Sequence, residues 1–204
     1  MKVCQVGRSM VEMLGVLAII GVLSVGAIAG YSKAMLKHRL NKQSEQLNQV
    51  INAMILHAGD FKTDASSTNT TAMFIKMGLI PKEMVKTNNT SNIYDVFGNQ
   101  IHTTYETGTK ADTFYLIFNI DKSEQSMAVC RNFFIVAKEY HEQLYIMESL
   151  SGWGTSDSLG SAYYGDKYCS SAGSCMRNLT LSKIDDMCAM HVNKTSSHVK
   201  LRVK

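Results

Sequence analysis

Glu12 is the only charged side chain in a long apolar stretch near the start of the sequence. Between Met10 and Ala29, every residue except Glu12 and Ser24 is apolar or glycine. About twenty such residues in a helix cover the hydrocarbon thickness of a bilayer. A carboxylate in that environment costs roughly 2.5–3.5 kcal/mol on insertion scales. We therefore expect Glu12 to gain a cationic partner, because a nearby opposite charge stabilises a buried carboxylate.

Four of the five cysteines lie after residue 129 and form a second group of side chains that could carry chemistry. An even set of cysteines is typical of disulfides, and hence of an oxidising compartment. Three connectivities are possible, and the sequence does not choose among them. We favour Cys130 with Cys188 and Cys169 with Cys175. Two alternatives stay open: Cys130, on an apolar face, could be a buried free thiol, and Cys169, Cys175, Cys188 and His191 could bind zinc, although no C-x-x-C pair occurs.

The sequence contains no recognised catalytic pattern. It lacks G-x-S-x-G, H-E-x-x-H and a phosphate-binding glycine loop. The neighbouring acids Asp185 and Asp186 indicate a solvated helix face rather than an acid pair. A net charge of +4 with dispersed basic residues disfavours nucleic-acid binding. We therefore expect a protein that is not an enzyme and that uses no cofactor or metal.

The apolar stretch belongs to a segment from Gly7 to Tyr31, which two ordinary interpretations fit poorly. A secretory signal peptide keeps its apolar region unbroken, whereas Glu12 interrupts it. A permanent membrane anchor also tolerates Glu12 poorly. The flanking charges leave the orientation of such an anchor ambiguous. Lys2 and Arg8 precede the apolar stretch, whereas more basic residues follow it: Lys33, Lys37, Arg39 and Lys42.

Gly7, Arg8 and Glu12 resemble the signature of the type IV pilins: a short leader that ends in glycine, cleavage after it, and glutamate at the fifth mature position before an apolar helix. The resemblance implies that prepilin peptidase cuts the Gly7–Arg8 bond on the cytoplasmic side. It also implies that Glu12 meets the N-terminal amine, carried by Arg8, of a neighbouring subunit during assembly. Two positions depart from the pattern. Arg8 stands where an apolar residue is usual, which leaves N-methylation open, and Ala29 stands where many members have proline.

Glycines punctuate the apolar stretch in place of that proline. Each glycine weakens a helix by about 1 kcal/mol relative to alanine, so the segment can melt locally in a filament. Glycines also let neighbouring helices approach closely, although they are common in membrane helices in general. The residues concerned are Gly15, Gly21, Gly26 and Gly30.

Helical periodicity continues beyond Tyr31, where the apolar residues occupy one face. The pattern predicts one helix from Ser9 to Gly59, with the glycine as its C-terminal stop. Such a helix is about 75 Å long, far longer than a bilayer is thick. We expect four parts in the chain: a leader at 1–7, a transmembrane and assembly half-helix at 8–30, an amphipathic half-helix at 31–59, and a globular head domain at 60–204.

The head domain is expected to be mixed in secondary structure. Its patterns predict helices at 72–77, 123–140 and 181–189, a hairpin turning at Gly98-Asn99, and strands at 112–120 and 198–204. Residues 143–150 could continue a helix or form a strand. Residues 151–168 indicate an exposed loop, in which Trp153 to Tyr168 are candidate contact residues. The predicted class is α+β, with the pilin fold that the resemblance implies: a long N-terminal helix packed on an antiparallel sheet, and a disulfide-bonded C-terminal region.

These observations favour a structural subunit of a type IV pilus-like filament. Its expected partners are membrane lipid before assembly, prepilin peptidase, the inner-membrane assembly machinery and other copies of the chain. Its expected location is the bacterial inner membrane as a precursor, followed by a cell-surface pilus. One alternative is a pseudopilin of a type II secretion system, in a periplasmic filament. Another is a single-pass, membrane-anchored extracytoplasmic binding domain that keeps residues 1–7.

Overall fold

The structure is a computed structural model that describes residues 10–60, 67–107, 113–151, 158–170, 174–192 and 197–204. The chain divides into two compact units, residues 1–39 and residues 40–204. We call the second of these the head unit. The predicted long helix is present as α1 (Met10–His57), which ends two residues before Gly59. We refer to residues 10–39 as the N-terminal segment of α1 and to residues 40–57 as its C-terminal segment.

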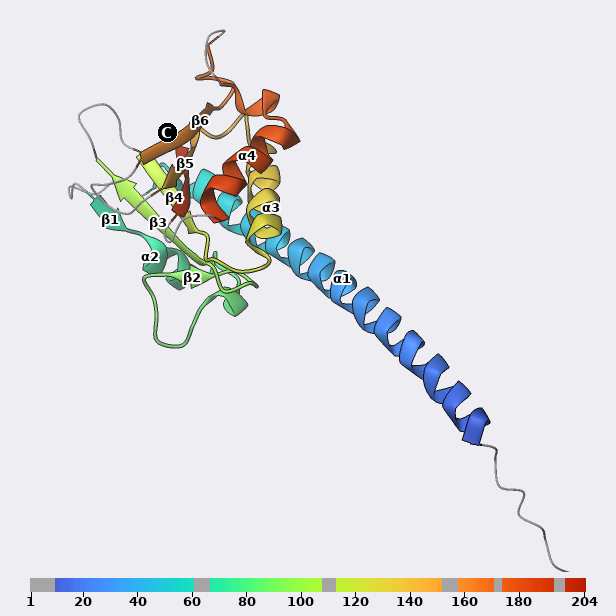
Figure 1. The fold of residues 1–204 in the computed structure, drawn as a ribbon. Coiled ribbons are helices and arrows are strands. Elements are labelled where there is room, and N and C mark those ends of the chain that lie inside the picture. Colours follow the sequence, from blue (N-terminus) through green and yellow to red (C-terminus); the bar gives the residue numbers. More distant parts are fainter. Residues whose placement is uncertain (1–9, 61–66, 108–112, 152–157, 171–173, 193–196) are drawn as a thin grey trace, which may run out of the picture. The chain divides into compact units, whose positions relative to one another are not determined.

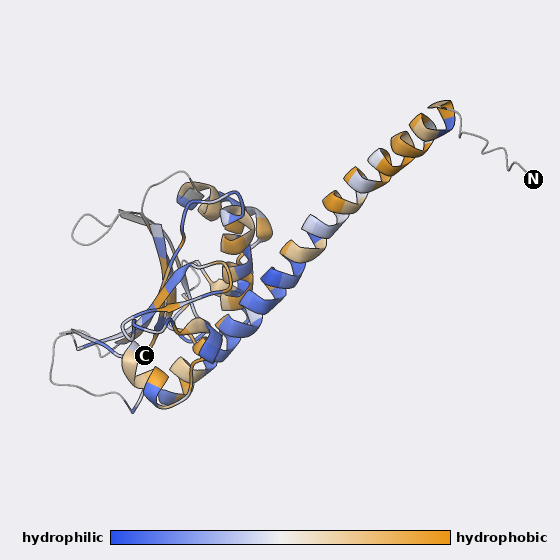
Figure 2. Ribbon diagram, turned by 90° about the horizontal axis from the view of Figure 1, so that it is seen from below, coloured by the Kyte–Doolittle hydropathy of each residue, from blue (hydrophilic) through white to orange (hydrophobic). Residues whose placement is uncertain are grey.

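The N-terminal segment of α1 is apolar around most of its circumference. Every side chain from Met10 to Met35 is exposed, and Figure 2 shows the hydrophobic colouring of this stretch giving way to hydrophilic colouring further along α1. The hydroxyls of Ser24 and Ser32 donate hydrogen bonds to the carbonyls of Ile20 and Ile28, at 2.7 and 3.0 Å. These two polar side chains are therefore satisfied by their own helix and need no water.

The C-terminal segment of α1 is amphipathic and belongs to the core of the head unit. Its buried side chains recur at spacings of three and four, which places them on one face of the helix. Two of them are polar, which the sequence pattern did not predict. The buried set is Gln43, Gln46, Leu47, Val50, Ile51, Ala53 and Met54.

A seven-stranded sheet forms the other layer of the head unit (Figure 1). The strand order is β1-β3-β4-β7-β5-β6, and β2 also pairs with β3. The six pairs between these described strands are antiparallel. The strands are β1 (Ser67–Asn69), β2 (Ile93–Tyr94), β3 (Gln100–Glu106), β4 (Thr113–Asn119), β5 (Ile146–Ser151), β6 (Ser158–Tyr164) and β7 (Ser197–Val203).

The predicted hairpin and the predicted interior strand are both confirmed. Strands β2 and β3 pair antiparallel, and Gly98 in their connection has φ +91°, a left-handed conformation that glycine adopts without strain. Strand β4 lies between β3 and β7. Its alternate residues Phe114, Leu116 and Phe118 are buried in the core, as a period of two requires.

Helices α3 (Ser126–Lys138) and α4 (Leu181–Val192) contribute to the same core as the C-terminal segment of α1. Phe133 of α3 stacks on Phe118 of β4 with ring centroids 4.5 Å apart. The remaining helical elements are short. They are α2 (Thr71–Lys76), η1 (Lys82–Met84) and η3 (Met176–Asn178). The fold is therefore α+β: a long N-terminal helix whose C-terminal segment packs with an antiparallel sheet and two further helices.

One sequence prediction is wrong. The sequence predicts an exposed loop at residues 151–168, but residues 158–164 are the edge strand β6. Their serines and glycine conceal the strand pattern, because β6 is held by main-chain pairing with β5 rather than by an alternating apolar face. The open question over residues 143–150 is also resolved, since β5 begins at Ile146. Trp153 lies outside the described residues.

Candidate functional site

Glu12 lies in the first turn of α1, and its side chain is exposed. An acid in a first helical turn interacts favourably with the positive end of the helix dipole. Gly7 and Arg8, the residues of the predicted cleavage site, lie outside the described residues. The cleavage, and the pairing of Glu12 with an amine at Arg8, therefore stay predictions.

Among the residues that the structure describes, no close contact requires the four glycines of the N-terminal segment. A Cβ placed at Gly15, Gly21, Gly26 or Gly30 would meet no atom within 4 Å. Gly165 in the head unit differs, because a Cβ there would collide with the carbonyl oxygen of Leu144. The packing of the head unit therefore explains why residue 165 is a glycine.

The cysteines form the two favoured disulfides. Cys130 of α3 is joined to Cys188 of α4 across 58 residues, and both are fully buried. Cys169 is joined to Cys175 across six residues. The alternative of a free thiol at Cys130 is therefore wrong. The zinc alternative is wrong as well, because all three of its cysteines are held in disulfides.

His191, the fourth residue of the zinc alternative, pairs with a serine instead. Its Nε2 lies 2.8 Å from Oγ of Ser149, which joins α4 to β5. A serine beside a histidine is also the start of a nucleophilic site. Here each residue is only 3% exposed, so no substrate reaches the pair. The contact connects α4 to the sheet. Sequence patterns could not predict it, because the two residues are 42 positions apart.

A buried carboxylate connects α1 to the β2–β3 hairpin. Asp95 is 5% exposed and accepts hydrogen bonds from the main-chain N–H groups of Phe97 and Asn99 at 2.9 and 2.8 Å. Gln43 of α1 donates its side-chain amide to Asp95 Oδ2 at 2.7 Å. Burial raises the pKa of Asp95, and the hydrogen bonds from Asn99, Gln43 and Phe97 oppose that rise.

The same part of α1 is also connected to helix α3 and to the hairpin main chain. Asn132 of α3 donates its side-chain amide to Oε1 of Gln43 at 2.9 Å. Oε1 of Gln46 accepts the main-chain N–H of Val96 at 2.9 Å. Directional polar contacts of this kind fix the rotation of the C-terminal segment about its axis, because apolar packing alone is less orientation-specific.

Comparisons with models of protein families, with curated proteins and with solved structures find no match for this chain.

Proposed function

We propose that this protein is the structural subunit of a type IV pilus-like filament, made as a membrane precursor and polymerised through α1. The observation that carries the proposal is the exposed apolar surface of the N-terminal segment. Exposing apolar side chains to water costs about 25 cal/mol of free energy for each Å² of apolar surface. The leucines, isoleucines and valines from Val11 to Ile28 are more than half exposed, so lipid or other copies of the chain must cover them.

The membrane stage is supported by length and composition. The structure has one helix among the described residues that is long and apolar enough to cross a membrane. Residues 10–30 rise by about 31 Å at 1.5 Å each, close to the thickness of a hydrocarbon core. The two disulfides favour an oxidising compartment for the head unit. With the head unit extracytoplasmic, the Gly7–Arg8 bond faces the cytoplasm, where the resemblance to pilins requires it.

The assembly stage is supported by Glu12. In lipid its carboxylate is costly, whereas beside the amine of a neighbouring copy it becomes half of an ion pair. Arg8 brings a second positive charge next to that amine. The long helix, the antiparallel sheet and the disulfide-bonded C-terminal region are compatible with a pilin-like fold. We accordingly assign the protein a structural role and not an enzymatic one.

The first test is the removal of the leader. Protein isolated from cells that contain prepilin peptidase is expected to be lighter, by intact-mass measurement, than protein from cells without it, by the mass of the residues up to Gly7. A Gly7→Val variant should keep the precursor mass in both. An unchanged mass for the native chain contradicts the proposal and favours a permanent anchor.

The second test is filament formation by Glu12→Ala. This variant should stay in the membrane but form no filaments, because the charge that pairs with the neighbouring amine is gone. Ser24→Ala is the matched control, since its hydroxyl only donates to the carbonyl of Ile20. Normal filaments from Glu12→Ala would reject the charge-pair mechanism. Filaments that can be sheared from the cell surface favour a pilus over a type II secretion pseudopilus.

A further inference from the structure

A group of basic residues follows the apolar stretch directly. Lys33, Lys37, Arg39 and Lys42 all precede Glu45, which is the first acid after Glu12. Lys42 is already engaged in the head unit, where its Nζ lies 3.1 Å from Glu45 and 3.0 Å from Glu83. The other lysines of the group differ from Lys42 in this respect.

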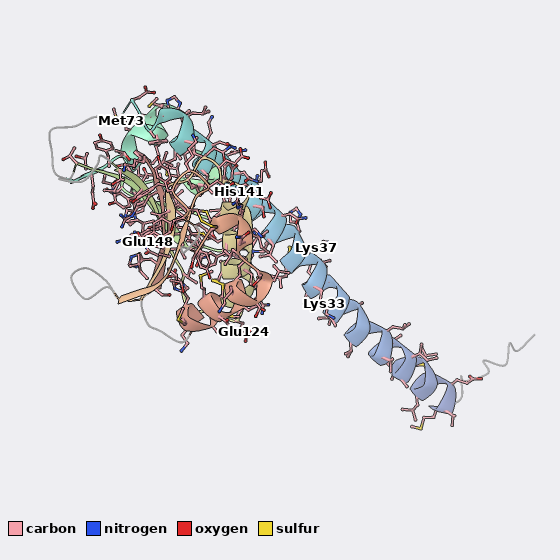
Figure 3. All side chains as sticks on the ribbon, turned by 90° about the horizontal axis from the view of Figure 1, so that it is seen from above. Lys33, Lys37, Met73, Glu124, His141 and Glu148 are labelled. Atoms are coloured by element: carbon pink, nitrogen blue, oxygen red, sulfur yellow. A yellow bond between two sulfur atoms is a disulfide. The ribbon has the colours of Figure 1, made fainter. Side chains whose placement is uncertain are left out.

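Lys33 and Lys37 form no ion pair with any residue that the structure describes. Both side chains are exposed, and Figure 3 shows them extending from α1. Their spacing of four residues places them on the same face of the helix, one turn apart. The two ammonium groups can therefore act on one ligand surface together.

The depth of these lysines follows from the length of the apolar stretch. If residues 10–30 fill the hydrocarbon core, Lys33 lies about 4.5 Å beyond its edge and Lys37 about 10 Å beyond it. The headgroup layer extends roughly 5–7 Å past that edge. Tyr31 lies at the boundary, where aromatic side chains are enriched. Long, flexible lysine side chains reach the headgroups from both positions.

We propose that Lys33 and Lys37 bind the phosphate groups of anionic phospholipids at the outer surface of the membrane. The inference rests on the membrane stage of the proposed function. The calculated depth favours a lipid headgroup over an acidic side chain of another copy, because it places both ammonium groups within reach of the headgroup layer. The lipid contact fixes the depth of the precursor, and assembly must release it. Attraction of this kind strengthens binding about fivefold for each lysine near an anionic surface.

The test measures lipid preference with the full chain reconstituted in vesicles of phosphatidylcholine, with and without phosphatidylglycerol. Electron paramagnetic resonance of spin-labelled lipids gives the ratio of phosphatidylglycerol to phosphatidylcholine in the layer that contacts the protein. We expect a preference for phosphatidylglycerol that falls with added salt. Lys33→Ser/Lys37→Ser should abolish it. Lys122→Ser/Lys183→Ser, which removes the same charge from exposed head-unit positions, should keep it.

Flotation with vesicles of phosphatidylcholine alone separates this inference from the proposed function. Flotation of all three proteins shows that the apolar stretch is inserted, whatever the lysines do. Failure of the native chain to float contradicts the membrane stage itself. Flotation with no phosphatidylglycerol preference, or with a preference that Lys33→Ser/Lys37→Ser retains, overturns the lipid assignment alone. Loss of contacts between copies in that variant without any lipid preference would assign the lysines to a protein partner instead.

Discussion

The two segments of α1 belong to one helix, but they differ in how their side chains are exposed. In residues 40–57, most apolar side chains gather on one face and are buried, whereas in residues 10–35 they surround the helix and every side chain is exposed. The C-terminal segment also buries two glutamines whose amides bind Asp95, Asn132 and the main chain at Val96. Among the described residues of the N-terminal segment, the serine hydroxyls are bonded to the same helix.

Helix formation and helix placement therefore have separate causes in this protein. The C-terminal segment has one fixed environment, which the head unit supplies through packing and directional hydrogen bonds. Residues 10–30 of the N-terminal segment are almost entirely apolar and exposed, which suits the proposed change of environment from lipid to neighbouring copies. Substitutions should therefore affect the free energy of unfolding of the head unit in one segment, and membrane insertion or assembly in the other.

The largest effect is expected from the disulfide that joins α3 to α4 in the core of the head unit. Cys130→Ala/Cys188→Ala should lower the free energy of unfolding by about 4 kcal/mol, because this bridge closes a loop of 58 residues. Cys169→Ala/Cys175→Ala should cost about 2 kcal/mol, since its loop is short. Denaturant unfolding of the full chain in detergent measures both. A larger loss for the short loop would contradict this account of the core.

The next effect comes from matched isoleucines in the two segments. Ile51→Ala should destabilise the head unit by about 3 kcal/mol, because Ile51 is fully buried and the substitution leaves a cavity. Ile19→Ala, at a residue 62% exposed, should leave the unfolding midpoint of the head unit unchanged. The same denaturant titration reports both. Equal losses would mean that the N-terminal segment packs within its own chain.

A smaller effect is expected for the buried glutamine. Gln43→Ala should cost about 2 kcal/mol, because Asp95 and Asn132 each lose a hydrogen-bond partner inside the protein. Gln49→Ala is the matched control on the exposed side of the same segment and should be neutral. Equilibrium unfolding distinguishes them. A neutral Gln43→Ala would show that the polar contacts do not hold the C-terminal segment.

The pH dependence of stability should follow from the direction in which the pKa of Asp95 is shifted. Burial raises the pKa of Asp95 above its ordinary 3.8, so the folded chain holds this proton more tightly than the unfolded chain. The contribution of Asp95 to the stability of the folded chain is full below pH 3.8 and is lost as the pH rises through the raised pKa. The stability of the native chain minus that of Asp95→Asn should therefore fall as the pH rises from about 3 to 7. A stability difference that rises over this range would contradict a raised pKa for Asp95.

The smallest effect is expected at a glycine of the N-terminal segment. Gly26→Ala should change the free energy of unfolding of the head unit by less than about 0.5 kcal/mol, because no atom lies within 4 Å of the added Cβ. Alanine should also favour the helix at this position. Differential scanning calorimetry of the native and variant chains provides the comparison. A clear shift in the unfolding temperature would mean that Gly26 contacts the head unit.

The sequence predicts most of the regular elements because their patterns are local. The bounds of α1, the hairpin turning at Gly98 and the interior strand β4 follow from apolar periodicity and turn residues. Strand β6 escaped prediction because its pairing with β5, and not its own residues, holds it. Gly160 looks like a loop residue, but it fits a strand position where a Cβ would come within 3.3 Å of the Ser149 side chain.

The candidate sites divide in the same way. Glu12 and the glycines are visible in sequence because they interrupt an apolar stretch. The buried contacts could not be predicted, because Gln43 and Asp95 are 52 residues apart and Ser149 and His191 are 42 apart. Only the folded chain brings such residues together. The disulfide pairing could be predicted in part. The four cysteines limit the connectivity to three possibilities, and the fold determines which of them forms.

The most direct test compares matched leucines in membranes that contain the full chain. In a Cys4→Ser background, Leu17→Cys and Leu56→Cys each introduce a thiol at a position whose native leucine is 62% and 76% exposed, respectively, in the chain. A membrane-impermeant maleimide is expected to label Leu56→Cys and to leave Leu17→Cys unlabelled, although both should react after denaturation. Equal labelling of the two in intact membranes would contradict the claim that lipid or neighbouring copies cover the N-terminal segment of α1.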